Sequence, residues 1–394
     1  VENLKLRVSW GKLGNQNIGY YPYQQVYSTI ACEYPFGYPG VLQPGVRNIT
    51  YNNRDITWET TAVTDIGLDF GIFNGTLTGS IDYFYKYTSD ILSSVEKTNI
   101  LGRGVGESNV GAVSNRGIEV MLTYNGKIGR EFRFSISPNF TYVKNAVEKL
   151  ADGKTEQINN ARIVGEPLGI IYGYQTDGIV QESDLTDGSY KITKDINGGV
   201  PQAGDIKFID QNGDGEINEA DKMILGDPNR PMTYGFQTKL TYKGLSLSAA
   251  FTGVSGYDVL NTNVRYEQTP SRQTSNLYQK VYNGMWTAEN PTNLYPRSTY
   301  KMPDVVMDRY IEDASYLRCS DITLNYVLPN KWMKKIGFRT TSIFASVKNA
   351  FVITDYSGYD PEVNSFAFDG LRPGIDMSSF PNMRSFIFGI NVNF

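Results

Sequence analysis

The chain has 394 residues, a formal net charge of −4 and 13% aromatic residues, with 28 tyrosines. This aromatic content excludes an intrinsically disordered chain, and the negative charge argues against nucleic-acid binding, which needs a basic surface. The sequence has no histidine, which excludes every catalytic dyad, triad or metal site that requires an imidazole. We expect no enzymatic activity. No apolar run approaches the roughly 20 residues that a transmembrane helix needs.

Apolar and polar residues alternate strictly along much of the chain, and this pattern predicts β-strands with one apolar and one polar face. In one of these strands, for example, Leu122 is followed by Thr123 and Tyr124. Ten strands are predicted, at residues 4–10, 66–72, 77–87, 118–124, 132–142, 234–242, 245–252, 321–328, 342–348 and 385–394.

Short and long connections alternate between the predicted strands. Asn74-Gly75, a type I′ turn signal, and Lys243-Gly244 are short connections, as are residues 125–129 and 329–337. The long connections are residues 11–64, 88–115, 144–232, 254–313 and 354–383.

All the short turns would then lie at one end of the sheet and all the long loops at the other. This arrangement is typical of a transmembrane, antiparallel, up-and-down β-barrel with periplasmic turns and extracellular loops. The predicted class is therefore all-β. A soluble sandwich or a solenoid remains the alternative, although sandwiches have Greek-key connections without this bias. The last strand ends in Phe394, a terminal pattern typical of outer-membrane barrels, whose exposed edge the barrel assembly machinery can pair with.

Several stretches of the sequence resemble the C-terminal part of SusC/RagA-like TonB-dependent outer-membrane receptors. They occur in the expected order over the whole chain, and their combination is specific although each piece alone is weak. The matching stretches are LKLRVSWGKLGNQ (4–16), NRGIEV (115–120), GEPLGIIYGY (165–174), GDIKFIDQNGDGEIN (204–218), LGDPNRPMTYGF (225–236), YLRCSDITLNY (316–326), YDPEV (359–363) and GIDMSSFPNMRSFIFGINVNF (374–394).

The resemblance implies a plugged barrel of roughly 22 strands, of which this chain would supply about ten. The plug, the TonB-contacting segment and the other strands are expected upstream, on the same polypeptide or on a separate chain. The ten strands alone are not expected to close. The implied location is the outer membrane of a Gram-negative bacterium, which the protein would cross several times in contact with lipid.

The function implied by the resemblance is active import of oligosaccharides or peptides, in a SusCD-type transporter. Its expected partners are a SusD-like surface lipoprotein and the inner-membrane TonB complex. A surface calcium-dependent glycan-binding protein and a siderophore- or cobalamin-type TonB-dependent receptor remain as alternatives.

The predicted extracellular loop 144–232 contains a calcium-type motif at residues 210–221 that matches D-x-[DN]-x-[DN]-G with a carboxylate at position 12. Side-chain oxygens would come from Asp210, Asn212 and Asp214, and a backbone carbonyl from Glu216. Asp221 takes position 12, where its shorter reach compared with glutamate suits calcium less well and could favour magnesium. We expect a structural cation and no flanking helix pair; a turn without metal is the alternative.

Aromatic residues are dense in the predicted loops, where they could stack on sugar rings or line a peptide site. The alternative is that they pack within their own loops or against a partner lid. The candidate substrate residues are Tyr20, Tyr21, Tyr23, Trp286, Tyr356 and Tyr359.

Overall fold

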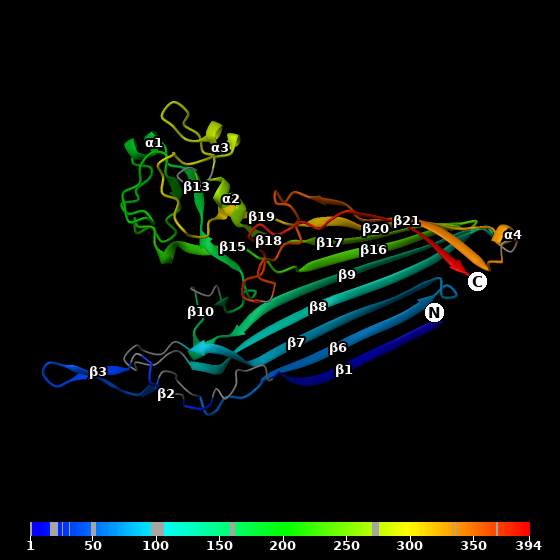
Figure 1. Cartoon of the computed structure of the whole chain (residues 1–394), viewed down its shortest axis with the longest axis horizontal. Helices are drawn as coiled ribbons and strands as arrows, with labels where there is room; N and C mark the ends of the chain where they lie inside the picture. The colour runs from blue at the N-terminus through cyan, green and yellow to red at the C-terminus, as the bar shows by residue number, and fades with distance from the viewer. Residues whose placement is uncertain are drawn as a thin grey trace.

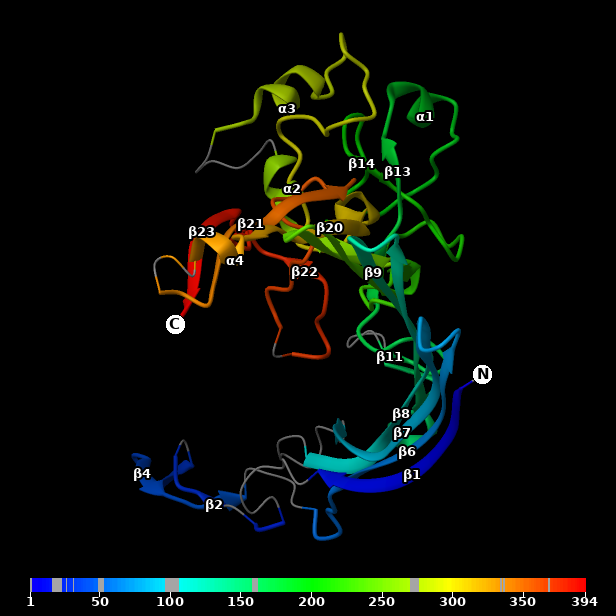
Figure 2. The same ribbon diagram turned by 90° about the vertical axis from the view of Figure 1, so that its right-hand side faces the viewer.

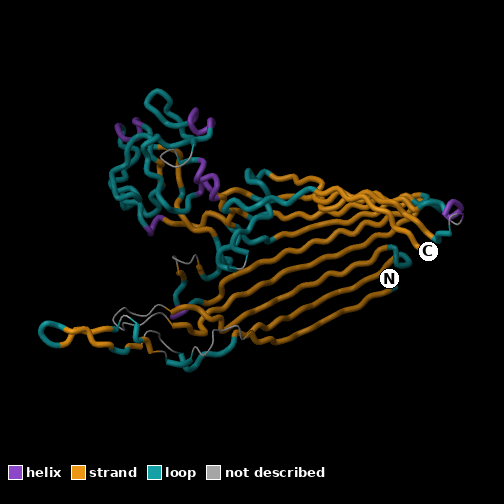
Figure 3. The backbone as a smooth tube through the Cα atoms, in the orientation of Figure 1, coloured by secondary structure: helices purple, strands orange, loops and turns teal. Residues whose placement is uncertain are grey.

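A single curved antiparallel sheet of ten strands forms the body of the molecule, and its long connections gather at one end (Figure 1; Figure 3). The structure, a computed structural model, describes residues 2–15, 23–25, 27–30, 32–48, 53–95, 106–157, 162–269, 276–333, 335, 337–367 and 369–394.

The strands of this sheet follow one another in chain order, as in an up-and-down meander. Each of the ten predicted strands is present, so the predicted fold class is confirmed. The strands are β1 (Asn3–Asn15), β6 (Glu59–Ile72), β7 (Leu77–Val95), β8 (Gly106–Ile128), β9 (Phe132–Lys149), β16 (Met232–Tyr242), β17 (Leu245–Ser255), β20 (Tyr316–Val327), β21 (Thr340–Thr354) and β23 (Ser385–Asn393).

The tight turns lie at the end of the sheet that also holds both chain termini (Figure 1). Between β6 and β7, the Thr76 amide donates to the Phe73 carbonyl at 3.1 Å across Asn74 and Gly75. Both central residues have positive φ, 57° and 72°, which confirms the predicted type I′ turn. A left-handed backbone at both positions matches the twist of the flanking strands. The short helix α4 (Asn330–Met333) lies in the β20–β21 connection at the same end.

The strand register brings the apolar residues of successive strands onto one face of the sheet. Ile66 pairs with Tyr83, Tyr83 with Ile118, and Ile118 with Tyr142. All four side chains are more than 40% exposed, so this face packs against nothing within the described part of the chain. Figure 2 shows that the sheet curls, as a segment of a barrel wall does. The strands β1 and β23 form its two edges and do not pair with each other.

Several strands extend further into the predicted loops than the alternation pattern indicated. In the predicted loop 11–64, β1 continues to Asn15 and β6 starts at Glu59. The predicted loop 88–115 is mostly strand, because β7 continues to Val95 and β8 starts at Gly106. Likewise β9 continues to Lys149, inside the predicted loop 144–232. Backbone pairing persists here without strict alternation, with register shifts between Thr88 and Ile91. The prediction was wrong at these boundaries because the alternation pattern shows only where one face of a strand is apolar. The backbone hydrogen bonds between two strands can continue past the point where that pattern ends.

The long connections contain their own short elements. The β1–β6 connection carries β2 (Tyr27–Ser28), β3 (Glu33–Phe36), β4 (Val41–Pro44) and β5 (Arg47–Asn48). The β9–β16 connection carries β10 (Glu156–Gln157), β11 (Arg162–Ile163), β12 (Ile171–Tyr174), β13 (Thr176–Ile179), α1 (Glu182–Thr186), β14 (Ile206–Phe208) and β15 (Lys222–Gly226). The last two loops carry β18 (Asp258–Asn261), α2 (Thr262–Glu267), α3 (Gln279–Gly284), β19 (Ile311–Asp313) and β22 (Ile375–Asp376).

The helices of the described residues are all too short or too polar to cross a membrane.

We predict that the two faces of β8 differ in their tolerance of charge. In the full-length protein, Leu122→Arg places a cation on the apolar face and should cost about 2–4 kcal/mol of unfolding free energy, provided that this face contacts lipid near the bilayer centre. Thr123→Arg, one residue along on the polar face, should cost much less. Urea titration of the reconstituted barrel measures both. Equal costs would indicate a packed sandwich core.

Candidate functional site

The β9–β16 and β17–β20 connections fold together into one loop domain at the open end of the sheet (Figure 1). Residues from both connections share its hydrophobic core, because strands this short cannot bury an apolar face alone. Phe208 of β14 packs edge-on against Tyr174 of β12, with ring centroids 5.9 Å apart. The buried core residues are Tyr174, Ile179, Ile192, Ile206, Phe208, Ile217, Tyr300, Met307 and Tyr310.

Polar contacts join the two connections around this core. The Thr176 hydroxyl donates to Asp308 at 2.7 Å. The buried Asp205 accepts from Arg297 Nε at 2.7 Å. Trp286 donates from Nε1 to the Gln181 side chain at 3.0 Å. Since each bond joins one connection to the other, the loop domain is a single folded unit.

A buried ion pair attaches the last loop, residues 355–384, to the barrel wall. Arg318 of β20 lies with its Nη2 2.6 Å from Asp360 and its Nε 3.2 Å from Glu362. The Arg318 and Asp360 side chains are 6% and 8% exposed. Tyr356, in the same loop, donates to Asp376 at 2.7 Å. Burial and this carboxylate both raise the pKa of the Tyr356 phenol, so the hydroxyl stays protonated and keeps donating.

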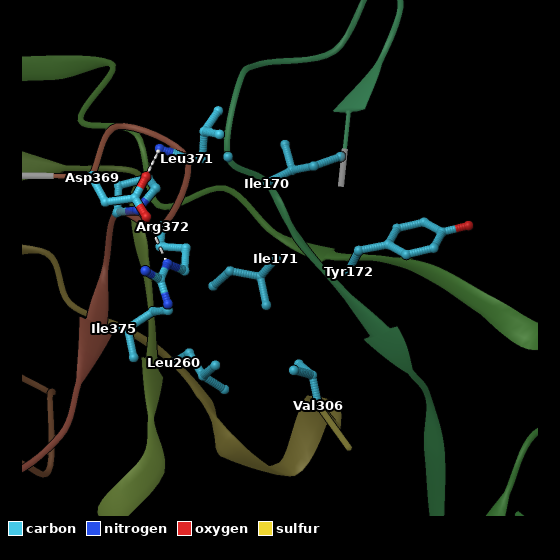
Figure 4. Close-up of a pocket in the computed structure, with 11 residues that line it drawn as sticks. Ile170, Ile171, Tyr172, Leu260, Val306, Asp369, Leu371, Arg372 and Ile375 are labelled. Atoms are coloured by element: carbon cyan, nitrogen blue, oxygen red, sulfur yellow. Dashed lines mark hydrogen bonds and ion pairs between the residues drawn. The ribbon is translucent and has the colours of Figure 1, made fainter. Parts of the chain in front are cut away.

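A pocket of about 380 Å³ lies where the loops meet. Figure 4 shows Ile171 and Tyr172 on one side of it and Arg372 on the other, with Leu260 and Val306 below. Arg372 donates to Asp369 at 2.7 Å, and its guanidinium lies 4.2 Å from the centroid of the Phe366 ring. An apolar floor with an ion pair at the rim can hold an apolar or aromatic group beside a polar one. Reasoning from sequence did not identify this pocket because its residues come from segments up to about 200 positions apart.

The calcium-type loop connects β14 to β15, without a helix pair on its flanks, as predicted. Asp210 accepts from the amides of Gly213 and Gly215 at 2.6 and 2.7 Å. Asp214 accepts from the Glu216 amide at 2.8 Å, and this bond lowers the pKa of its carboxyl. Gly215 has a φ of 83°, which permits the sharp turn at position 6.

Asp221, at position 12 of the motif, joins the two ends of the loop through hydrogen bonds. Its side chain is buried, and its two oxygens accept from the amides of Gln211 at 3.0 Å and Asn218 at 2.8 Å. The Glu216 side chain lies 3.0 Å from Lys194, whereas the predicted ligand at this position is the backbone carbonyl. Within the described residues, no three Asp, Glu, Cys or His side chains converge on a point where a metal could sit. Cation binding at this loop therefore stays a prediction.

The aromatic residues predicted to contact substrate differ in exposure where the structure describes them. Tyr20 and Tyr21 lie outside the described residues. Tyr23 and Tyr359 are exposed, at 47% and 78%, but Trp286 packs against the loop-domain core and Tyr356 is buried. Sequence alone could not separate exposed rings from packed ones, because the loop sequences show no regular alternation.

The polar face of the barrel wall carries a charge cluster near the N-terminus. Arg7 lies 2.9 Å from Asp69 on β6 and 2.6 Å from Asp82 on β7, which it reaches across the intervening strand. Gly67 lies between them in the register, and a Cβ there would collide with both Asp82 and Arg7. The glycine is therefore needed for this bridge.

One buried carboxylic acid of the loop domain, Asp195, has a raised pKa. Asp195 is 5% exposed, and burial raises its pKa to about 6. Its Oδ1 atom has no hydrogen-bond partner. Asp205, which also contributes to the upward shift, is held by Arg297. Neither carboxylate lines the pocket where the loops meet.

A curled antiparallel sheet with an apolar outer face, a polar inner face and loops gathered at one end defines a barrel wall of the outer-membrane type. Residues 1–350 match the family model described as TonB dependent receptor-like, beta-barrel. The chain belongs to this family.

Curated relatives match along the whole chain. It is 30% identical over 411 residues to "TonB-dependent receptor P3" of Formosa agariphila, covering 100% of this chain and 40% of that protein. It is 29% identical over 422 residues to "TonB-dependent receptor SusC" of Bacteroides thetaiotaomicron, covering 100% of this chain and 38% of that protein. The chain therefore spans about two fifths of the length of these relatives.

Solved structures show the same fold. The RagAB peptide transporter superposes with a TM-score of 0.78 at 23% sequence identity, covering 99% of this chain and 41% of that chain. The RagAB peptide importer in its "open-open" state gives a TM-score of 0.78 at 23% identity, with coverages of 100% and 40%. The predicted resemblance to SusC/RagA-like receptors is thereby confirmed.

We predict that Arg318→Gln releases loop 355–384 from the barrel wall. Removing one partner of a buried ion pair leaves Asp360 buried without its counterion, at a cost of about 3–5 kcal/mol. Limited proteolysis should then cut the loop faster than in the native protein. The matched control is Arg372→Gln, which breaks an exposed pair in the same loop worth about 0–1 kcal/mol. Equal proteolysis of the two variants would contradict the assignment.

Proposed function

We propose that this chain forms about ten strands of the barrel wall of a TonB-dependent outer-membrane importer that takes up oligosaccharides or peptides. The observation that carries the proposal is the ten-stranded sheet whose exposed face is apolar, in a chain that belongs to the TonB-dependent receptor family. An apolar face of this size, exposed on a whole sheet, suits lipid better than water. On this basis, the protein functions in transport and not in catalysis.

The edges of the sheet support a role as part of a larger barrel. Within hydrocarbon, an unpaired strand edge leaves backbone donors and acceptors unsatisfied at several kcal/mol each. The strands β1 and β23 are such edges. We therefore propose that further strands of the same assembly pair with both edges and that a plug fills the polar interior. The barrel assembly machinery would engage β23 during insertion.

The loop domain is the proposed meeting point of substrate and partner. The loop domain lies at the end of the sheet opposite the tight turns, which would face the outside of the cell (Figure 1). The neighbouring loop 355–384 carries the exposed Tyr359 and contributes residues to the pocket. A SusD-like surface lipoprotein would close over these loops, and the inner-membrane TonB complex would supply energy through the plug. The SusC relative and the RagAB fold support this arrangement.

We predict that Tyr359→Ala weakens uptake without unfolding the loop. An exposed ring that stacks on substrate contributes about 0.5–1.5 kcal/mol, equivalent to roughly 2- to 12-fold in affinity. Uptake of labelled oligosaccharide and peptide mixtures by cells carrying the full-length protein measures the effect, with and without the TonB complex.

The matched control for this experiment is Tyr356→Phe. It removes the buried hydrogen bond to Asp376 and should lower the melting temperature of the protein while sparing the uptake of either mixture at permissive temperature. Uptake that continues without the TonB complex would contradict the proposed function. Unchanged uptake in Tyr359→Ala would remove this ring from the substrate path.

We also propose that the loop of residues 210–221 binds calcium, or magnesium, as a structural ion. The amide bonds to Asp210 and Asp214 occupy only part of their oxygen lone pairs, and each ionised carboxylate offers about four acceptor sites. The lowered pKa of Asp214 keeps it ionised at neutral pH, as a cation ligand must be. The cation would hold the β14–β15 connection in place.

We predict that the double variant Asp210→Ala/Asp214→Ala abolishes cation binding and raises protease sensitivity between residues 144 and 232. Isothermal titration with calcium, then with magnesium, measures binding to the full-length protein. Glu219→Gln is the matched control, because Glu219 lies in the same loop outside the ligand positions and pairs with Lys222. If native protein binds neither cation, the loop is a metal-free turn.

A further inference from the structure

The apolar face of the sheet carries two neighbouring cations, one of which lies ten residues along β8 from its loop end at Gly106. Arg116 of β8 and Lys144 of β9 are partners in the strand ladder, and both side chains are exposed. They share their face with Ile118 and Tyr142, which are partners two residues further towards the tight turns. Arg116 and Lys144 therefore project on the face that the proposed function assigns to lipid.

On the proposed membrane location, the register puts this pair towards the outer side of the apolar band. Arg116 pairs with Tyr85 of β7, eight residues beyond Leu77 at the start of that strand. Eight residues at about 3.4 Å each span about 27 Å along the strand. A strand tilt of about 40° reduces this to roughly 20 Å along the membrane normal, close to the height of about 25 Å for an apolar band. Trp10 of β1 lies in the same row of paired residues across the sheet, because it pairs with Thr64, which in turn pairs with Tyr85.

Within the described part of the chain, neither cation of this pair forms an ion pair. The acidic side chain further along that face of β9, Glu148, accepts from the Ser114 hydroxyl at 2.5 Å. Like charges directly opposite each other on adjacent strands destabilise a sheet. A doubly charged anion between Arg116 and Lys144 would turn that repulsion into two attractions.

We propose that Arg116 and Lys144 together bind the phosphate of a phosphorylated lipid in the outer leaflet of the outer membrane. An arginine presents a planar fork that matches phosphate oxygens, and a lysine beside it adds a compact charge. The exposed apolar surfaces of Ile118 and Tyr142, 45% and 44% exposed, lie on the membrane side of the pair. They suit acyl chains, so the occupant is a lipid and not free phosphate.

This inference rests on the proposed membrane location. The experiment is designed so that a failure of the lipid site can be distinguished from a failure of the membrane location. The full-length protein is purified in detergent and titrated with phosphorylated lipid A and with its dephosphorylated form, and native mass spectrometry measures both affinities. At about 1 kcal/mol for each cation near a membrane surface, Arg116→Gln/Lys144→Gln should weaken binding of the phosphorylated form about thirtyfold. Each single variant should lose about fivefold. Binding of the dephosphorylated form should not change.

Lys239→Gln is the matched control, because Lys239 is an exposed cation on the opposite face of the sheet. It should leave lipid affinity unchanged. In detergent free of phosphorylated lipid, the melting temperature of the double variant should be no lower than that of the native protein. The two substitutions remove a repulsion between like charges and introduce no larger side chain.

Three results would overturn the proposal. They are native affinity in the double variant, an equal loss in the Lys239→Gln control, and displacement of the lipid by an equal concentration of inorganic phosphate. Insertion into bilayers is measured separately on the same samples. A protein that inserts without preferring phosphorylated lipid overturns the inference alone, whereas one that fails to insert counts against the membrane location as well.

Discussion

The backbone hydrogen bonds between neighbouring strands are the interaction on which the rest of this molecule depends. A membrane offers no water to satisfy peptide groups, so a β-structure can cross it only if each strand pairs on both sides. Nine consecutive pairings join the ten strands in chain order. This meander places every tight turn at one end and every long loop at the other. The two faces then differ simply by residue parity, one apolar and one polar.

The loops are built by a different principle. In the loop domain, short strands such as β12 and β14 pair locally and then bury their side chains in a core shared by two connections. Arg318 joins the last loop to the wall through the buried Asp360. The barrel wall therefore acts as a rigid frame for the loop domain, and the pocket forms where its segments meet. In such scaffolds, binding residues commonly lie on loops held by a rigid frame.

The two faces of the barrel wall differ in how their charged residues are paired. On the polar face, Arg7 bridges two carboxylates across a glycine, and Lys348 lies 2.7 Å from Asp321. These charges are paired within the sheet. On the apolar face, Arg116 and Lys144 lie at one margin without such partners. This contrast within the described residues is the basis of the proposed lipid phosphate site.

The sequence by itself determined the class of fold, the ten strands, the direction of their faces and the type I′ turn at Asn74-Gly75. These features are local, because alternation with period two and the left-handed preference of Asn-Gly act over a few residues. Sequence also identified the family through stretches spread along the chain. Only the tertiary structure decided that β7, β8 and β9 continue into the predicted loops. It also decided that Tyr356 is buried while Tyr359 is exposed, and that Arg116 and Lys144 are neighbours. Each of these depends on contacts between segments distant in sequence, which no local pattern encodes.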